Sequence, residues 1–158
     1  MGDWFNKPID NLPSSISNLI LGIKFNQPID NLPNLLIHLK LCNYFNKSVD
    51  NLPKYLKYIR FGGYFNKSID LLPDSIEEIV FDNYYQYNDI YTDFCDFGTS
   101  LIINQQINKL PKNLKKITID NNRIIEKNEK NNMVDEFNKL VNEIYYQQYK
   151  KCKYCNEI

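Results

Sequence analysis

The sequence predicts an α/β repeat solenoid in which each coil of about 20 residues contributes one short parallel strand and a C-terminal amphipathic helix caps one end. Two observations support this prediction. A nine-residue segment that begins with Phe-Asn and ends with Leu-Pro starts at Phe5 and returns at Phe25, Phe45 and Phe65. From residue 131 onward the apolar residues change to helical spacing. Repeats of this period form coils that cannot close a core alone and must stack on their neighbours.

Length and charge limit the classes of protein that the chain can belong to. Its 158 residues suffice for one domain with a substantial core. Lys and Arg number 19, as do Asp and Glu, so no net charge draws the chain to nucleic acid or to a membrane surface. No apolar run approaches the roughly 18 residues of a membrane span, and the start lacks the pattern of a signal peptide. We therefore expect a cytoplasmic protein that binds neither nucleic acid nor membranes.

Each regular coil carries the pattern L-x-x-L-x-L at a fixed distance from its proline. Ile16, Leu19 and Leu21 follow Pro13 by three, six and eight positions, and the same spacing follows the next three prolines. The last alternation is the signature of a short strand. Because strands of adjacent coils lie about 4.8 Å apart, identical residues should form ladders. The expected aromatic ladder is Phe5, Phe25, Phe45, Phe65 and Tyr85.

Polar residues also recur at the coil period. Asn6 and its equivalents at 26, 46 and 66 are expected to satisfy backbone groups that a tight coil buries. Asp10 and its equivalents at 30, 50 and 70 are expected to face solvent and to accept N–H groups of the turns. A stacked calcium site is the alternative reading of the aspartates.

The period fails after Phe81 and returns once, at Pro111, two positions short of where the second coil after Pro73 would place it. We therefore divide the solenoid, residues 1–122, into regular coils at 4–83, an irregular coil or loop at 84–109 and a last coil at 110–122. The irregular segment is either a degenerate coil whose strand is Leu101 to Ile103 or a protruding loop. Its early part is a candidate contact patch because acidic and aromatic residues gather there without a basic residue: Asp82, Asp89, Asp93, Asp96, Tyr84, Tyr85, Tyr87 and Tyr91.

Residues 123–158 are predicted to form the capping helix and a short tail. An apolar stripe runs from Met133 to Tyr149, and Asp135 and Glu136 suit the positive end of the helix dipole. The helix is expected to cover the open end of the solenoid, with dimerisation through the same stripe as the alternative. No comparable cap precedes the first coil, so Trp4 and Phe5 should be partly exposed. This predicts weak self-association through the N-terminal end, or the loss of an upstream segment.

The residues that support catalysis or metal binding are scarce. His38 is the single histidine, and the chain contains no nucleophile motif, phosphate-binding loop or zinc-protease helix. Cys152 and Cys155 have the spacing of zinc ligands, but zinc takes four ligands and no second pair lies nearby. Two chains sharing one zinc is one interpretation, and two free thiols in the tail is the other. We expect no enzymatic activity, no cofactor and no metal site within one chain.

The segment from Phe25 to Pro33 resembles the FNIP repeat, a leucine-rich-repeat-like (LRR-like) unit named for Phe-Asn-Ile-Pro. The resemblance covers residues 4 to about 83 and, weakly, the copy near Pro111. Such repeats occur in social amoebae and in giant DNA viruses that infect amoebae, so the resemblance implies a viral or amoebal interaction protein without established catalytic residues. Viral members often carry an F-box, a ubiquitin-ligase docking module, ahead of the repeats, and none precedes them here.

Internal comparison of the coils separates scaffold positions from candidate contact positions. Between the recurring apolar residues of the strands, the side chains change freely from coil to coil. We expect this strip to bind a protein partner of unknown identity, with Tyr58 and Arg60 as central anchors. The alternatives are a ubiquitin-ligase substrate adaptor that lacks its F-box and a structural or degenerate repeat fragment. The candidate residues are Asn18, Ile20, His38, Lys40, Cys42, Tyr58, Arg60, Glu78, Val80, Asp82, Lys116, Thr118 and Asp120.

Overall fold

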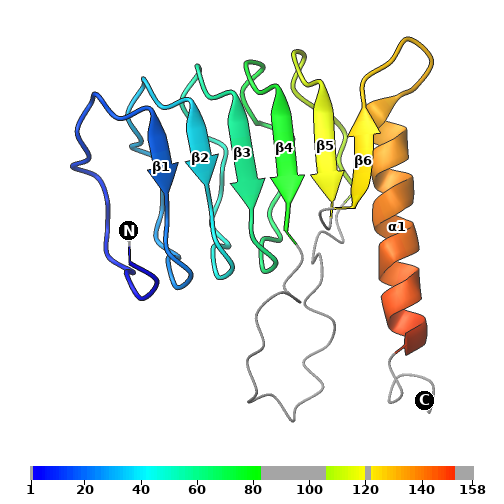
Figure 1. Ribbon diagram of the computed structural model, residues 1–158, viewed down its shortest axis with the longest axis horizontal. Coiled ribbons are helices and arrows are strands. Elements are labelled where there is room, and N and C mark those ends of the chain that lie inside the picture. Colours follow the sequence, from blue (N-terminus) through cyan, green and yellow to red (C-terminus); the bar gives the residue numbers. More distant parts are fainter. Residues whose placement is uncertain (1, 83–105, 120–121, 152–158) are drawn as a thin grey trace.

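The computed structural model describes residues 2–82, 106–119 and 122–151 and arranges six strands side by side in one sheet, with a helix at its far end (Figure 1). The strands follow one another in chain order. This confirms the predicted solenoid of short parallel strands with a C-terminal helical cap. The elements are β1 (Asn18–Ile20), β2 (His38–Lys40), β3 (Tyr58–Phe61), β4 (Glu78–Phe81), β5 (Lys116–Ile119), β6 (Arg123–Glu126) and α1 (Met133–Lys151).

Strands β1 to β4 pair in parallel, and each step between them advances the chain by one full coil. Leu19 pairs with Leu39, Leu39 with Ile59 and Ile59 with Ile79. All four side chains are buried, as the L-x-x-L-x-L pattern requires. The core is therefore one continuous apolar ladder, and each coil buries its inner side chains against the next.

The phenylalanines that open the coils stack as predicted. The ring centroids of Phe5 and Phe25 lie 6.2 Å apart, those of Phe25 and Phe45 6.3 Å, and those of Phe45 and Phe65 6.2 Å. The interplanar angles do not exceed 10°. The repeat thus fixes the orientation of the rings as well as their positions. Tyr85, the predicted next member, lies outside the described residues.

The asparagine ladder carries one repeated hydrogen bond. The backbone N–H groups of Asn26, Asn46 and Asn66 each donate to the Oδ1 atom of the asparagine one coil earlier, at 2.9 Å in all three cases. This confirms that the ladder satisfies backbone groups. Because each bond joins two coils, a single coil has no partner for it and depends on its neighbour.

Three aspartates of the coils, Asp10, Asp30 and Asp70, accept hydrogen bonds from the following coil. Asp10 accepts from the side-chain amide of Asn31 at 3.1 Å, and Asp70 accepts the backbone N–H of Asn108 at 2.9 Å. The expected role as a turn acceptor is thus observed at Asp70. Across the described part of the chain, no group of three or more His, Cys, Asp or Glu residues is placed to hold a metal ion, so the calcium reading gains no support.

The break in the repeat lies between two strands that pair directly. Glu78 of β4 pairs with Lys116 of β5, and Val80 pairs with Thr118, although the chain between them is nearly twice as long as one coil. β4 and β5 are therefore neighbours in the sheet, and the strand that a degenerate coil would have at Leu101 to Ile103 lies outside the described residues. Residues 83–105, including the predicted contact patch beyond Asp82, lie outside the described residues.

The C-terminal end contains a strand that the sequence did not reveal. β6 falls within the segment expected to hold only helix and tail, and it pairs antiparallel with β5, with Ile117 opposite Ile125. The side chain of Ile125 is buried, so the hairpin extends the core by one further rung. β6 thus covers the edge of β5 that an unfinished solenoid would expose.

Helix α1 closes the core beyond β6. The side-chain oxygen of Asn132 accepts a backbone N–H of the first turn, as a helix N-cap does. The ring of Phe137 is fully buried and lies 5.5 Å from that of Phe81. Asn138 exchanges two hydrogen bonds of 2.9 Å with the backbone of Ile107. The buried stripe consists of Met133, Phe137, Val141 and Ile144.

The N-terminal end has no such cover among the described residues. Within the described residues, β1 pairs with β2 and with no strand on its other side. Trp4 is 83% exposed, and Phe5 is partly buried against Phe25. Both findings agree with the predicted partial exposure of this end.

Candidate functional site

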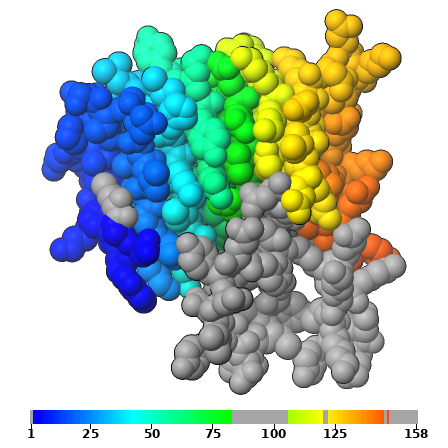
Figure 2. All heavy atoms as spheres, viewed as in Figure 1, coloured from blue at the N-terminus to red at the C-terminus, as the bar shows by residue number. Residues whose placement is uncertain are grey.

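The outward side chains of the strands form two rows, which we call the strand face. Each coil contributes one band to the surface, from the blue N-terminal coil to the yellow strands β5 and β6, with α1 beyond them (Figure 2). The register places the candidate residues of successive coils next to one another. The first row is Asn18, His38, Tyr58, Glu78, Lys116 and Glu126, and the second is Ile20, Lys40, Arg60, Val80, Thr118 and Ile124.

The β1 to β3 part of the strand face combines apolar and aromatic side chains with the charge of Lys40. Ile20 is 58% exposed, and His38 is exposed with its ring 5.9 Å from that of Tyr58. Lys40 lies in register between Ile20 and Arg60. Within the ranges that the structure describes, Lys40 forms no ion pair.

Exposed apolar residues also lie just before β2 and β3, at positions that sequence reasoning missed. Leu35 is 58% exposed, Ile37 38% and Tyr55 54%. They precede the strands, whereas the predicted contact positions lie within the strands or just after them. The signal was present, since Leu35 and Tyr55 occupy the same coil position as Ser15 and Ser75 and vary just as freely. They extend the apolar surface beyond the two rows.

Arg60, one of the two expected anchors, is already engaged within the chain. Its guanidinium pairs with the carboxylate of Asp82, and this hydrogen bond raises the pKa of Arg60 above its usual value. The other carboxylate oxygen of Asp82 is buried and lacks a hydrogen-bond partner within the described residues. Burial raises the pKa of the neighbouring Tyr58 hydroxyl, which therefore stays protonated at neutral pH. Tyr58 can thus contact a partner without losing an ion pair, whereas Arg60 cannot.

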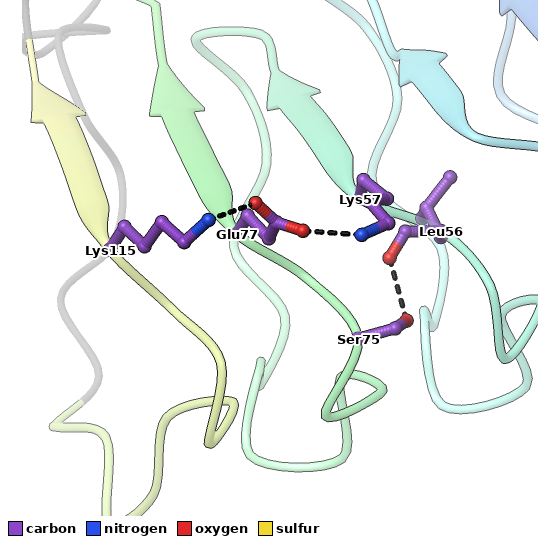
Figure 3. Close-up of polar contacts among 5 residues, drawn as sticks. All are labelled: Leu56, Lys57, Ser75, Glu77 and Lys115. Carbon is purple, nitrogen blue, oxygen red and sulfur yellow. Dashed lines mark hydrogen bonds and ion pairs between the residues drawn. The ribbon is translucent and has the colours of Figure 1, made fainter.

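Glu77 lies immediately before β4 and joins three coils. Its two carboxylate oxygens pair with Lys57 of the preceding coil and Lys115 of the following one (Figure 3). Hydrogen bonds from Lys115 and Lys57 lower the pKa of Glu77 to about 2. Beside this cluster, the hydroxyl of Ser75 donates to the carbonyl of Leu56 at 2.7 Å. Lys57, Glu77 and Lys115 occupy the same position in successive coils, and this alternation of charge could have predicted the cluster. It was not apparent from the sequence because Lys115 follows Glu77 by more than one coil length.

The β4 to β5 part of the strand face offers a partner fewer exposed side chains and fewer charges outside ion pairs than the β1 to β3 part. The ammonium of Lys116 lies 3.4 Å from a carboxylate oxygen of Glu78. Val80, a candidate contact residue, is only 7% exposed and presents little surface to a partner. Thr118 is partly exposed. The candidate Asp120 lies outside the described residues.

The described part of the site shows no arrangement that suggests catalysis. Burial raises the pKa of the Cys42 thiol, which favours the unreactive protonated form. Cys152 and Cys155, the weak metal candidates, lie outside the described residues. A shallow hollow of about 450 Å³ is lined by Glu77, Lys112, Asn113, Leu114, Lys115 and Lys127. Its lysines are engaged, since Lys112 pairs with Asp74 at 3.0 Å and Lys127 donates to the carbonyl of Lys112 at 3.0 Å.

Comparison with known proteins places the repeats in a described family. The FNIP Repeat family matches residues 5–44 and 45–84, together half of the chain. No curated protein matches the chain. Among solved structures it resembles CroV588 of a giant virus, described as a novel circular LRR protein structure, with 31% identity and a TM-score of 0.47. This likeness covers 75% of the present chain and 19% of CroV588, so the chain spans less than a fifth of that protein's length. In the described ranges, no helix has the length and apolar character that crossing a membrane requires.

Proposed function

Since this chain belongs to the FNIP repeat family, we propose that it is a non-enzymatic scaffold that binds a partner protein through the strand face. The observation that carries the proposal is the contrast between the two sides of each strand. Core positions repeat from coil to coil, whereas outward positions change from Ile20 to Lys40 to Arg60 at equivalent places. A rigid array with constant backbone and variable side chains is the arrangement by which solenoids bind extended partners.

The location and partner class follow from the same reading. We propose that the protein acts in the cytoplasm, of the host cell if the chain is viral. A formal net charge of zero supports a protein partner over nucleic acid. The strand-face residues that would form the contact are His38, Lys40, Tyr58, Arg60, Glu78, Lys116 and Thr118, with Asp82 directly after β4, while Val80 would contribute little because it is buried.

The proposal is tested by recovering partners with a strand-face variant. Proximity labelling in the native cell, with Tyr58→Ala plus Arg60→Ala beside the unmutated chain, should show a loss of about tenfold or more for specific partners. Tyr58→Ala alone is the sharper variant, because it keeps the pair between Arg60 and Asp82. Leu71→Ala is the matched control, since Leu71 is 63% exposed in a turn outside the strands. Equal recovery by all variants would refute the role of the strand face.

We also propose weak self-association through the open N-terminal end. The 83% exposure of Trp4 supports it, because a large apolar side chain exposed at one end of the solenoid is available to a second chain. Sedimentation velocity over a range of concentrations should show a weak dimer that Trp4→Ser diminishes. A monomer at every concentration, or a dimer indifferent to the substitution, would contradict this.

A further inference from the structure

We infer that the partner docks on the β1 to β3 part of the strand face and presents a carboxylate beside an apolar side chain, with Lys40 as the residue that receives the carboxylate. The inference rests on the proposed function and specifies the chemistry of the partner. It follows from two independent observations, the distribution of paired charges and the distribution of exposed apolar surface.

The first observation is the pairing of the other cations on and beside β3 to β5. Lys57 and Lys115 share Glu77, Arg60 pairs with Asp82, and Lys116 pairs with Glu78. A partner that used one of these cations would have to displace an internal carboxylate first. Lys40 has no carboxylate to displace within the described residues. It is therefore the cation of the strand face that an incoming carboxylate can engage at the least cost.

The second observation is that exposed apolar side chains lie on the same strands as Lys40 or directly before them. Ile20, 58% exposed, is the neighbour of Lys40 in register on β1. Exposed Leu35 and Ile37 precede β2, and the rings of His38 and Tyr58 form the adjoining row. On β4 the corresponding position is Val80, which is 7% exposed. Exposed apolar side chains therefore lie on and beside the strands that flank Lys40, and the second row has one more exposed apolar residue, Ile124 on β6, at 54%.

Charge and surface together favour a protein segment. A nucleic-acid strand requires a series of cations to follow its phosphates, and the neighbouring cations on β3 to β5 are already neutralised. An apolar segment without charge would leave the ammonium of Lys40 in contact with apolar atoms and partly desolvated. A segment that places Asp or Glu next to Leu, Ile, Phe or Tyr satisfies both parts of the surface.

The test selects peptides from a displayed library of short random sequences on the immobilised full chain. The unmutated protein should enrich peptides with an acidic residue beside an apolar one. Lys40→Glu should weaken binding of the selected peptides about tenfold or more and should enrich basic peptides instead. Lys47→Glu is the matched control, because it makes the same charge change in an exposed turn of the next coil and should leave selection unchanged. The thermal unfolding midpoint of each variant shows that the fold is retained.

The outcomes separate the inference from the function on which it rests. Peptides without acidic residues, or selection that Lys40→Glu leaves unchanged while Tyr58→Ala abolishes it, would overturn the inference and leave strand-face binding intact. Selection that neither variant affects, or no enrichment of peptides at all, would count against both the role of Lys40 and binding by the strand face. A dimer of the unmutated chain that Lys40→Glu dissociates would overturn the inference by identifying a second copy as the occupant.

Discussion

The two ends of the solenoid are finished in different ways. At the C-terminal end, β6 pairs with the last parallel strand and α1 places Phe137 against Phe81. At the N-terminal end, no strand of the described residues pairs with β1 on the side away from β2, and Trp4 is 83% exposed. The comparison shows that the repeat builds the interior but cannot terminate it, because every coil leaves core and hydrogen-bonding groups for a neighbour. Residues outside the repeat must supply the termination, and the described residues include them at one end.

The largest effect is expected where the cap fills the core. Phe137→Ala should lower the free energy of unfolding by about 3 to 5 kcal/mol, because the side chain is fully buried and its removal leaves a cavity. Urea denaturation followed by circular dichroism measures the change. Glu143→Ala, on the exposed side of α1, should stay within about 0.5 kcal/mol. Similar losses for both variants would show that α1 does not act by covering the core.

A smaller effect is expected in the interior ladder, and it should depend on the distance from the open end. Asn46→Ala removes the acceptor for the backbone N–H of Asn66 and should cost about 1 to 3 kcal/mol, because that group becomes buried without a partner. The same substitution at Asn6, where water reaches the freed N–H of Asn26, should cost about 0.5 kcal/mol or less. Equal costs in urea titrations would mean that the ladder bonds do not stabilise the interior.

The sequence predicted the interior well because one rule operates in every coil. The stacking of Phe25 between Phe5 and Phe45 and the burial of Leu39 and Ile59 follow from period and alternation alone. The sequence predicted the C-terminal end less well. Arg123 to Glu126 gave no signal for β6, because its pairing partner lies across a hairpin and not one coil away.

The positions of the candidate site residues could be predicted from the sequence, but the pairing and burial of their side chains could not. Register alone placed Lys40, Tyr58 and Arg60 side by side. The pairing of Arg60 with Asp82 and the burial of Val80 depend on side-chain conformations in neighbouring coils, which a single coil does not encode. The ion pair between Glu77 and Lys115 could not be predicted, because the sequence allowed either a degenerate coil or a loop between the coils that carry these two residues.

The Glu77 bridge should produce a modest dependence of stability on pH. The pKa of Glu77 falls from 4.5 to about 2 on folding, so its ion pairs stabilise the fold fully above about pH 4.5, and this contribution disappears as the pH drops towards 2. Glu77→Gln should therefore lower the melting temperature at pH 7 but not at pH 2, and added salt should reduce the difference at pH 7. A deficit that is the same at both pH values would contradict the assigned pKa.

The smallest effect is expected for removal of the excess chain between β4 and β5. Deleting residues 85–102 restores the regular coil step between these strands and should change the free energy of unfolding by no more than about 1 kcal/mol, because the entropy of joining two strands depends only weakly on the length of the connection. Urea denaturation provides the measurement. A loss of several kcal/mol would show that the solenoid depends on the deleted residues.

Cross-strand nuclear Overhauser effects from β4 test the central claim most directly, namely that successive coils stack in register across the break in the repeat. The structure predicts contacts from the backbone of Val80 to Arg60 on one side and to Thr118 on the other. Contacts from Val80 to residues 101–103 in place of Thr118 would contradict it, since they would insert another strand between β4 and β5.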